Sequence, residues 1–534
     1  MKKNLLTYVA ILLLLSQMLC GCFAITTTPG TTVTTTTGSG FKPSPSPSQP
    51  SGECKVKEDH TDGDANGFCD TCQADVTVTL DLYAVNDLHG KFEDSESQSG
   101  VDELTTYLRN SVKTNEASIL LSSGDMWQGS SESNVTRGNI ITDWMNDLGF
   151  ASMTLGNHEY DWGAASVREN AEIAEFPLLA INVFERDTNQ RVEYCEASVL
   201  IERGNLTVGI IGAIGDCYSS ISSDQVEDIY FKTGSQLTAL VIAEAKSLRE
   251  RGADYIVYSI HDGYGSNSSA KDISSNSLSS YYDPSLSRDG HVDMVFEGHT
   301  HKGYVLRDTY GVYHLQGGGD NTGITHARVE VNFVTDGSTV TTAEQLRSSS
   351  LSHFADDPIG LELLLKYDTL IAPTRRVLGY NPSYLSSDIL CDLLARLYYE
   401  IGVETWGDEY NIVSGGGFLQ TRSPYDLEIG DVIYSDIQMI FPFDNAIMLC
   451  QVSGRNLQRK FLNSSGSYHI YCGAYGTGLN QNTSLIDPNA TYYVIVDSYT
   501  AQYASNGLTV VEVLAPDIFP RDLLAEYIES GGLN

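Results

Sequence analysis

Five short segments of the sequence combine aspartate, asparagine and histidine in patterns suited to binding divalent cations. One of them, GNHEYD, contains Asn157, His158 and Asp161 and directly follows the apolar run ASMTL. The other four are NDLHG, GDMWQG, HDG and GHTH, and their candidate ligands are Asp87, His89, Asp125, His261, His299 and His301. Carboxylates, imidazoles and amide oxygens are the groups that hold zinc, manganese, iron and similar ions in proteins.

Each of these segments follows a short run typical of a β-strand. The runs are 76–85, 117–123, 149–155, 253–260 and 291–297, and they are rich in β-branched and aromatic residues. Segments 101–113 and 234–252 lie between some of these runs and predict helices. This alternation indicates a layered α/β domain. Since ligands of open α/β sheets bind beyond the carboxyl ends of the strands, we expect the five segments to converge on one site.

The spacing within the segments agrees with a shared site. In extended chain, residues two apart point the same way, so Asp87 and His89 can face one ion, as can His299 and His301. Five of the eleven histidines lie in these segments. A single histidine is more often a satisfied buried residue than a ligand, but five such segments in order at strand ends argue against coincidence.

The order of the five segments resembles that of the calcineurin-type metallophosphoesterases. The GNHEYD variant resembles the 5′-nucleotidase branch, which includes bacterial UDP-sugar hydrolases, and the resemblance spans about residues 78–515. It implies a layered α/β sandwich metallophosphoesterase domain, followed by an α+β 5′-nucleotidase-type C-terminal domain. It also implies a phosphoric ester hydrolase that uses two divalent cations such as Mn, Zn or Co and acts on nucleotides, with nucleotide sugars as further candidates.

The resemblance also assigns roles to the residues of the five segments. It implies that one cation is held by Asp87, His89, Asp125 and His301, and the other by the bridging Asp125 together with Asn157, His261 and His299. The cations would clamp the phosphoryl oxygens and activate a water for in-line attack. His158 would be the catalytic histidine, oriented by Asp161. For Glu159 we expect only a structural salt bridge.

The second half of the chain resembles the domain that supplies the nucleoside pocket in the same family. Segment 386–402 predicts its clearest helix. Phe443 in FPFDN and Tyr499 in VDSYT fall where two aromatic rings hold the base in that family. Either ring could instead be an ordinary core aromatic.

Two departures from the family pattern affect this pocket. The pattern Asn-Gly-Gly-Gly-Ile-Arg is replaced by SGGGFL, which keeps Gly416 and Gly417 as candidate substrate-binding residues but puts Leu419 where the arginine would be. Arg422 lies near and is a candidate replacement. The Gly-Gly-Asp-Gly segment near the C-terminus is replaced by YASNGL. We therefore expect a broad nucleotide preference rather than strict 5′-AMP specificity.

The N-terminus is typical of an exported lipoprotein. Two lysines precede a short apolar run at 12–15, which is too short for a good transmembrane helix. Leu19, Gly21 and Cys22 resemble a lipobox with Cys22 as the lipidated residue; an ordinary cleaved signal peptide is the alternative. A Thr/Ser/Pro-rich linker at 23–53 would hold the folded part away from the membrane. The prediction is an extracytoplasmic protein anchored to the bacterial cell membrane.

Residues 54–75 are rich in cysteine and aspartate and could bind a further metal. Calcium is one candidate, because Asp62, Asp64 and Asn66 match the first half of an EF-hand loop and Asp70 falls at its ninth position. The twelfth position is Gln73 instead of glutamate, so the full loop is absent. Zinc is the other candidate, with ligands Cys54, His60, Cys69 and Cys72. A solvated acidic turn is the third interpretation.

Length and charge complete the prediction. We expect a signal peptide at 1–22, the linker at 23–53, the Cys/Asp-rich module at 54–75, a catalytic domain at 76–350, a connecting helix at 351–375 and a substrate-binding domain at 376–534. The net charge of −37 argues against binding to a nucleic acid polymer. The alternative functions are a 2′,3′-cyclic-nucleotide 2′-phosphodiesterase with 3′-nucleotidase activity and a non-catalytic surface-binding protein. No oligomeric state is predicted.

Overall fold

The computed structural model describes most of the chain beyond the linker. The described residues are 54, 56–92, 100–263, 291–308, 311–351, 354–419, 426–462, 468–473, 486–503, 506–515 and 518–533. They all belong to the second of two compact units, Gly52–Asn534. The predicted signal peptide, Cys22, the linker and Arg422 lie outside the described residues. No helix among the described residues is both long and apolar enough to cross a membrane.

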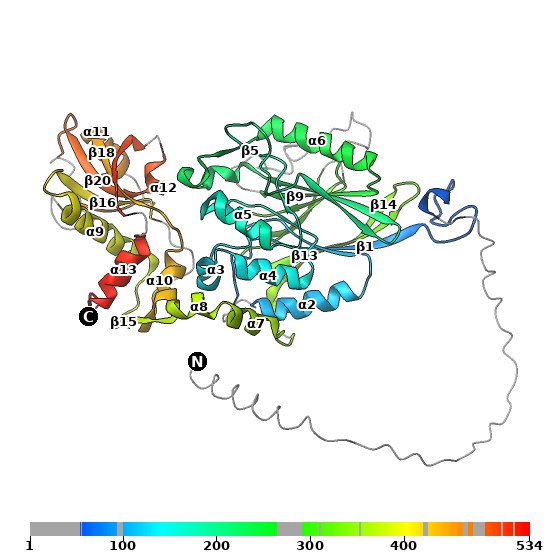
Figure 1. Cartoon of the computed structure of the whole chain (residues 1–534), viewed down its shortest axis with the longest axis horizontal. Helices are drawn as coiled ribbons and strands as arrows, with labels where there is room; N and C mark the ends of the chain where they lie inside the picture. Colours follow the sequence, from blue (N-terminus) through cyan, green and yellow to red (C-terminus); the bar gives the residue numbers. More distant parts are fainter. Residues whose placement is uncertain are drawn as a thin grey trace, which may run out of the picture. The chain divides into compact units, whose positions relative to one another are not determined.

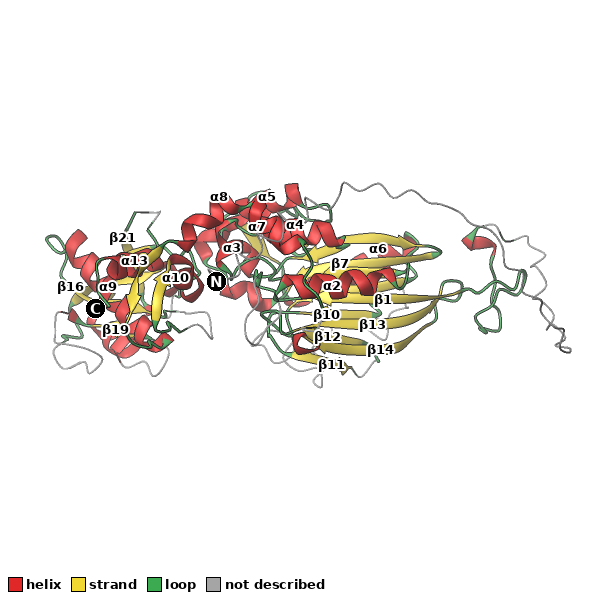
Figure 2. Cartoon of the chain, turned by 90° about the horizontal axis from the view of Figure 1, so that it is seen from below, coloured by secondary structure: helices red, strands yellow, loops and turns green. Residues whose placement is uncertain are grey.

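Two six-stranded sheets form the larger domain (Figures 1 and 2). The first sheet has the order β14 (Ser338–Arg347), β13 (Gly323–Asn332), β1 (Thr77–Val85), β2 (Ser118–Ser122), β3 (Ser152–Thr154) and β4 (Leu178–Leu179). The second has the order β11 (Gly303–Arg307), β12 (Tyr313–Gly317), β10 (Met294–Glu297), β9 (Tyr255–His261), β7 (Leu206–Ile214) and β6 (Ser198–Arg203). β1 to β4 are mutually parallel, as are β7, β9, β10 and β12. The five predicted strand runs are therefore confirmed.

Alternating side chains divide the strands between an inner and an outer core. On β1, Leu80 and Leu82 belong to the cluster shared by both sheets, whereas Tyr83 and Val85 pack on the outer face. That outer face is covered by the helices α2 (Val101–Lys113), α4 (Asn139–Leu148) and α5 (Gly163–Ile173). The second sheet is covered by α6 (Gly234–Glu250). Figure 1 shows α6 on one side of the strands and α2 and α4 on the other. This is the predicted α/β sandwich.

Smaller elements complete this domain. They are the helix α3 (Ser131–Val135) and a two-stranded sheet of β5 (Val183–Glu185) and β8 (Ile229–Phe231). A 3₁₀ turn, Lys57–Asp59, lies in the Cys/Asp-rich module. The predicted helices at 101–113 and 234–252 correspond to α2 and α6.

The predicted connecting helix is wrong in one respect. The chain forms α7 (Ile359–Lys366), α8 (Asp368–Ile371) and a 3₁₀ turn, Ala372–Arg375, instead of one continuous helix. The break lies at Tyr367, which leaves helical geometry and donates a hydrogen bond from its hydroxyl to Asp143 of α4 (2.6 Å). Tertiary packing on α4 therefore interrupts a pattern that is helical in sequence.

The C-terminal domain contains a five-stranded mixed sheet flanked by helices. Its order is β19 (His469–Tyr471), β16 (Ile412–Gly417), β20 (Thr491–Asp497), β18 (Ile447–Ser453) and β21 (Leu508–Val513). The helices are α9 (Ser387–Trp406), α10 (Tyr434–Ile440), α11 (Gly454–Asn456), α12 (Ser498–Ala501) and α13 (Pro520–Glu529). β15 (Val377–Asn381) pairs with β17 (Gly430–Ile433). This is the predicted α+β domain, and α9 covers the segment expected to be its clearest helix.

Candidate metal centre

The ends of five parallel strands bring all seven predicted ligands to one edge of the sandwich. One group consists of Asp87, His89 and His301, whose ligand atoms lie within 4.8 Å of one another. A second group at the same spacing consists of Asp87, Asp125 and His261. Asn157 joins them through its Oδ1, which lies 3.0 Å from Nδ1 of His299. The rings of His261 and His299 are 5.6 Å apart.

Hydrogen bonds to main-chain carbonyls fix which ring nitrogen of two histidines faces the site. Nδ1 of His261 lies 2.7 Å from the carbonyl O of Ser123, and Nδ1 of His89 lies 2.9 Å from that of Gln128. Because a carbonyl only accepts, both Nδ1 atoms carry hydrogen and both Nε2 atoms present a lone pair. This is the tautomer that a metal-binding histidine needs.

Two of the atoms that meet at this edge have no hydrogen-bond partner among the described residues. Nε2 of His261 lies 2.9 Å from Oδ2 of Asp125, and both atoms are buried. Nε2 of His89 lies 2.9 Å from Nε2 of His301, which donates to it when its hydrogen is on Nε2. The lone pair of His261 and the carboxylate oxygen of Asp125, facing each other at 2.9 Å, require a cation or a proton between them. The donor set of carboxylates, imidazoles and an amide oxygen therefore fits divalent metal ions.

The pKa shifts of the buried pair Asp125 and His261 also indicate a need for positive charge between the two side chains. Burial lowers the pKa of His261, but the neighbouring Asp125 and Asp87 outweigh burial and raise it to about 10. Burial raises the pKa of Asp125, yet His261 and His158 hold it well below its usual range. Both shifts show a strong demand for positive charge at a point shielded from water.

The ligands are presented on unusual backbone. Five of the seven lie in the left-handed region, with φ of +49° at Asp87, +53° at His89 and Asp125, +70° at His299 and +55° at His301. Such conformations cost on the order of 1–3 kcal/mol each and persist only where the surroundings enforce them. Here the loops brace one another: the N–H of His89 donates to the carbonyl of Asp125 (3.0 Å), and the N–H of His299 donates to the Asp87 carboxylate (2.9 and 3.0 Å).

Glu159 is the main brace, and the salt bridge expected for it is wrong. Its side chain is fully buried and accepts hydrogen bonds from four main-chain N–H groups. The donors are Asp125 (2.9 Å), Met126 (2.8 Å), Trp127 (3.3 Å) and Gly156 (2.7 Å). Burial, and next Asp125, raise the pKa of Glu159 to about 7. One carboxylate thus joins the loop after β2 to the loop after β3, and only the fold shows why it is needed.

His158 and Asp161 form a pair beside the ligand cluster. Nδ1 of His158 lies 2.7 Å from Oδ2 of Asp161, and the N–H of His158 donates to Oδ1 of Asp125 (2.8 Å). The His158 ring lies 5.2 Å from the ring of His89. It also stacks on Phe443 of the C-terminal domain, with ring centres 5.9 Å apart and planes 27° apart. The carboxylate fixes the hydrogen on Nδ1, so an additional proton would be carried on Nε2.

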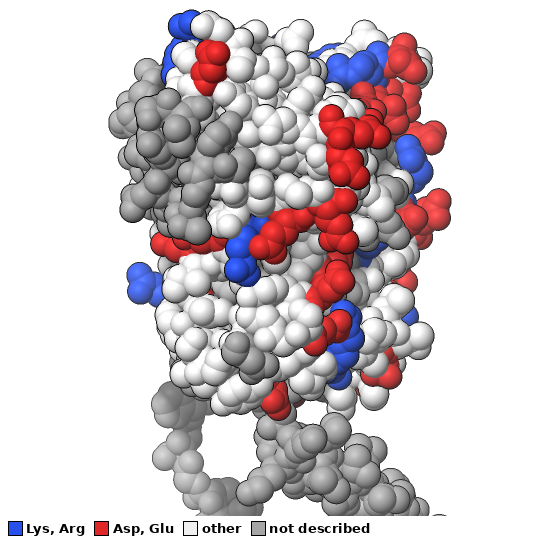
Figure 3. All heavy atoms as spheres, turned by 90° about the vertical axis from the view of Figure 1, so that its left-hand side faces the viewer, with Lys and Arg blue, Asp and Glu red and all other residues white. Residues whose placement is uncertain are grey.

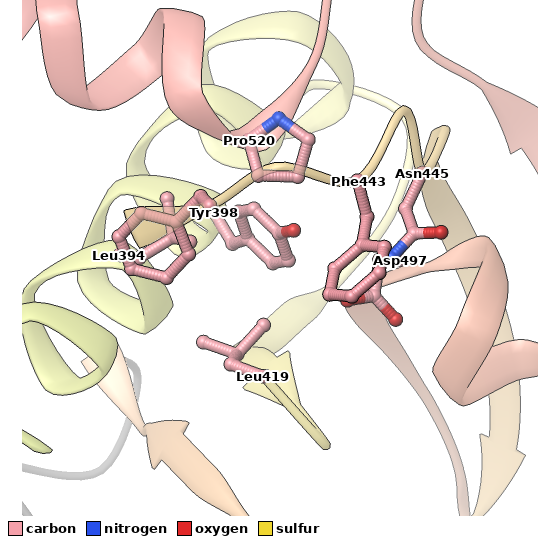
Figure 4. Close-up of a pocket in the computed structure, with 8 residues that line it drawn as sticks. Leu394, Tyr398, Leu419, Phe443, Asn445, Asp497 and Pro520 are labelled. Carbon is pink, nitrogen blue, oxygen red and sulfur yellow. The ribbon is translucent and has the colours of Figure 1, made fainter. Parts of the chain in front are cut away.

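The two aromatic residues of the predicted base clamp have different aromatic neighbours, and their joint role stays a prediction. Phe443 contacts His158, whereas the ring of Tyr499 packs against Phe418 (5.9 Å) and Tyr503 (5.4 Å). Phe443 also lines a pocket of the C-terminal domain, and Figure 4 shows it with Leu419 and Asp497 around a common space. The volume of about 10 Å³ is that of a single water, so this pocket does not hold a base.

The predicted role of the glycines is accounted for by packing. Gly416 and Gly417 are buried in β16. A Cβ on Gly416 would lie 2.1 Å from the carbonyl O of His469, and one on Gly417 would lie 2.5 Å from Oγ1 of Thr500. Close approach of neighbouring elements explains both residues without a substrate contact. Direct substrate binding by either glycine stays a prediction.

Two residues that we did not predict also lie at the centre. Asn86 is buried; its Nδ2 donates to Oδ2 of Asp87 and to the carbonyl of Gly318 (both 2.6 Å), which orients the carboxylate. Sγ of Cys217 lies near the nitrogens of His261 and His299 but donates to the carbonyl of His261 (2.9 Å). Burial raises the pKa of Cys217 well above its usual range, so it remains a thiol. Its adjacency to the site has no signature in the sequence.

The acidic protein surface bears on how a phosphate group could reach the candidate metal centre. On the face shown in Figure 3, acidic side chains form a run with few basic ones among them. This agrees with the net charge of −37. Such a surface repels phosphorylated molecules. A phosphate group would therefore have to be attracted by charge at the site itself, which bound cations would provide.

Comparisons with known proteins agree with this geometry. Residues 80–303 match the calcineurin-like phosphoesterase family. Protein UshA of Yersinia enterocolitica is 23% identical over 533 residues, covering 88% of this chain and 91% of UshA. A 5′-nucleotidase of Vibrio cholerae is 21% identical over 471 residues, which cover 79% of this chain and 82% of that protein. The crystal structure of a 5′-nucleotidase precursor from Thermus thermophilus superposes with a TM-score of 0.64 at 18% identity. The match covers 85% of this chain and 96% of that chain.

Replacing Glu159 with glutamine is expected to loosen the centre without touching a ligand. The amide nitrogen of glutamine cannot accept the main-chain N–H groups, so part of the brace is lost. We expect about a 10- to 100-fold weaker affinity for divalent cations, the range for lost support of metal ligands. Calorimetric titration of the metal-free protein with Mn²⁺ measures this.

The matched control is Glu172→Gln, an exposed glutamate of α5. It should bind cations like the wild type. Equal affinities in the two variants would show that Glu159 does not support the ligand loops.

Proposed function

We propose that the chain hydrolyses nucleotides outside the cytoplasm at a two-cation centre. It belongs to the 5′-nucleotidase and UDP-sugar hydrolase family of calcineurin-type metallophosphoesterases, which are metal-dependent phosphoric ester hydrolases. The observation that carries the proposal is the buried contact of Oδ2 of Asp125 with Nε2 of His261, beside the His158–Asp161 pair. A cation requirement and a proton-carrying histidine meet at one edge of the sandwich. A non-catalytic binding protein would need neither.

The ligand assignment that we propose divides the seven residues between two cations. Asp87, His89 and His301 hold the first, and Asn157, His261 and His299 hold the second, with Asp125 between them. The group of Asp87, His89 and His301 supports the first set, and the contact of Asn157 with His299 supports the second. Asp87 also lies in a group with Asp125 and His261. The cations would supply positive charge and Lewis acidity toward the phosphoryl oxygens.

The residues of the chain supply orientation and proton transfer. Asp161 holds the His158 ring by accepting from Nδ1, so a protonated His158 would donate from Nε2 to a phosphoryl oxygen or to the leaving oxygen. Phe443 stacks on the same ring. Glu159 and Asn86 keep the ligand loops in place.

A nucleotide substrate is supported by the relatives, which include a 5′-nucleotidase, and by the placement of Phe443. A base could stack on Phe443 while its phosphate lies at the cations, since Phe443 contacts His158. Leu419 is buried and lines the pocket behind Phe443, so it offers no charge to the substrate. We therefore propose broad recognition of nucleotides, with nucleotide sugars included.

Export and lipid anchoring form a further part of the proposal. The lysines, the apolar run and the lipobox-like residues before Cys22 support it, as does the linker that follows. Two or three acyl chains at Cys22 would anchor the protein stably.

Variants of Asp125 and His158 should separate metal binding from proton transfer. In Asp125→Ala we expect loss of activity and of bound metal, because this buried carboxylate faces Nε2 of His261 at 2.9 Å and is proposed to lie between the two cations. In His158→Ala we expect nearly normal metal content with turnover reduced by about 10²–10³, the range for a lost transition-state donor. Metal analysis and phosphate release from a nucleotide panel measure the two effects.

The control for both is Asp187→Ala, an exposed position. Full activity and two metals per chain in Asp125→Ala would remove the bridging assignment. Unchanged turnover in His158→Ala would make that residue structural.

Removing the Phe443 ring should affect nucleotides more than small esters. An aromatic stack is worth about 0.5–1.5 kcal/mol beyond its buried area, so Phe443→Ala should raise KM for nucleotides about two- to tenfold. KM for p-nitrophenyl phosphate should change little, because this ester has no base to stack. Tyr499→Ala tests the second ring of the predicted clamp in the same way.

Tyr380→Ala, an exposed tyrosine of the same domain, is the matched control. Equal KM effects of Phe443→Ala on nucleotides and on p-nitrophenyl phosphate would exclude base stacking. The protein would then be a phosphoesterase with another organic substrate.

Replacing Cys22 with serine should release the protein from the membrane. Lipid attachment needs the thiol, so Cys22→Ser should move the activity from the membrane fraction of the native host to the soluble fraction. Immunoblots of both fractions measure the shift, with Cys20→Ser as the matched control. A Cys22→Ser protein that stays in the membrane fraction would contradict the anchor.

A further inference from the structure

The Cys/Asp-rich module lies at the opposite end of β1 from the candidate metal centre. It joins β1 at Thr77, whereas Asp87 follows the other end of the strand at Val85. The nine residues of β1 at about 3.3 Å each separate the two places by about 30 Å. The module is therefore independent of the catalytic chemistry, and nothing proposed above uses it.

Three cysteines and one histidine of this module converge. The ligand atoms of Cys54, His60, Cys69 and Cys72 all lie within 4.8 Å of one another. Sγ of Cys54 lies 3.7 Å from Sγ of Cys69, and Sγ of Cys72 lies 3.5 Å from Nδ1 of His60. In a tetrahedral zinc site, bond lengths of about 2.0–2.3 Å put neighbouring ligand atoms about 3.3–3.8 Å apart. Both distances fall in that range.

The three cysteines of the module are free thiols and form no disulfide. Cys69 and Cys72 are buried, and Cys54 is half-buried. Thiols that meet a histidine, two of them in a CxxC pair, are common zinc ligands.

The module has little else to hold its conformation. Its apolar cluster consists of Cys69, Cys72, Val76 and Phe333, with Cys54, Ala74, Val78 and Val334 at its margin. A segment of this size rarely folds on so small a core without a metal or disulfides. Contacts with the catalytic domain include the ion pair of Lys57 with Asp254 (2.5 Å), the edge-on meeting of the His60 ring with Phe333, and a hydrogen bond from Asn332 to Asp62 (2.5 Å).

We propose that Cys54, His60, Cys69 and Cys72 bind one structural Zn²⁺ that fixes the module to the base of the catalytic domain. The ion would close a chain segment that starts at the end of the linker and ends at the start of β1. It would thereby give the predicted tether a rigid point of attachment. The protein would contain zinc outside its catalytic centre, with no open position for a substrate.

The neighbouring acidic loop brings the carboxylates of Asp62, Asp64 and Asp70 within 4.8 Å of one another. Asp62 accepts from the N–H groups of Asn66 (3.0 Å) and Gly67 (3.1 Å), and Asp70 accepts from that of Gly63 (2.8 Å). These bonds already use the carboxylates to shape a turn. The amide of Gln73 donates to the carbonyl of Cys69 (3.0 Å). Calcium binding by Asp62, Asp64, Asn66 and Asp70 stays a prediction, and it is an outcome of the test.

The test uses the full chain, reconstituted with Co²⁺ as a spectroscopic substitute for zinc. Cobalt held by thiolates gives a charge-transfer absorption that cobalt held by carboxylates and imidazoles does not. We expect this absorption in the wild type and in Asp125→Ala, and its loss in Cys72→Ser. Cys72→Ser should also contain one zinc fewer per chain and melt at a lower temperature, while kcat for p-nitrophenyl phosphate stays within about twofold.

Cys217→Ser and Cys472→Ser are the matched controls, and both should keep the absorption. Wild-type protein gives a second measurement that needs no variant: Zn²⁺ should protect Cys54, Cys69 and Cys72 from alkylation, and a chelator should expose them. Three results would overturn the proposal. They are unchanged zinc in Cys72→Ser, a Cys54–Cys69 disulfide in the zinc-loaded protein, and binding of Ca²⁺ without Zn²⁺ by the module.

Discussion

At the carboxyl edge of the sandwich, Oδ2 of Asp125 and Nε2 of His261 face each other at 2.9 Å in a place that water does not reach. The tautomer of His261 is fixed by Ser123, so neither atom can donate to the other without gaining a proton. Much of the surrounding structure is arranged around this unmet need for positive charge. A metal centre is its simplest resolution, and the acidic protein surface leaves phosphate recognition to the same charge.

The left-handed backbone at the candidate ligands is unfavourable in conformational energy. Main-chain hydrogen bonds in the fold stabilise it. Left-handed backbone at Asp87 and Asp125 turns their carboxylates inward. Glu159 stabilises these turns because one buried carboxylate satisfies four N–H groups that would otherwise be unpaired. The ligands can therefore be preorganised before any cation arrives. A buried acid with no ligand role thus holds together the loops that carry Asp125 and Asn157.

The second domain packs against the candidate centre. Phe443 stacks on His158, and Ser131 of α3 donates to Gln438 of α10 (2.7 Å). The stacking places an aromatic surface next to His158. The packing of Gly416 and Gly417 serves this arrangement indirectly, since it seats β16 against its neighbours.

The sequence alone determined the α/β class, the strands and the candidate ligands that meet at one edge, because each candidate segment follows its own apolar run and carries a distinctive local pattern. It could not determine the contacts of Glu159 or the break at Tyr367. Each of these depends on contacts between residues far apart in the chain. Glu159 looks like a surface acid until the loop after β2 surrounds it, and the helical pattern around Tyr367 yields to Asp143. The cysteines of the module were visible as candidates, but only the tertiary structure brought Cys54 and His60 to Cys69 and Cys72, since metal geometry is decided by distance in space.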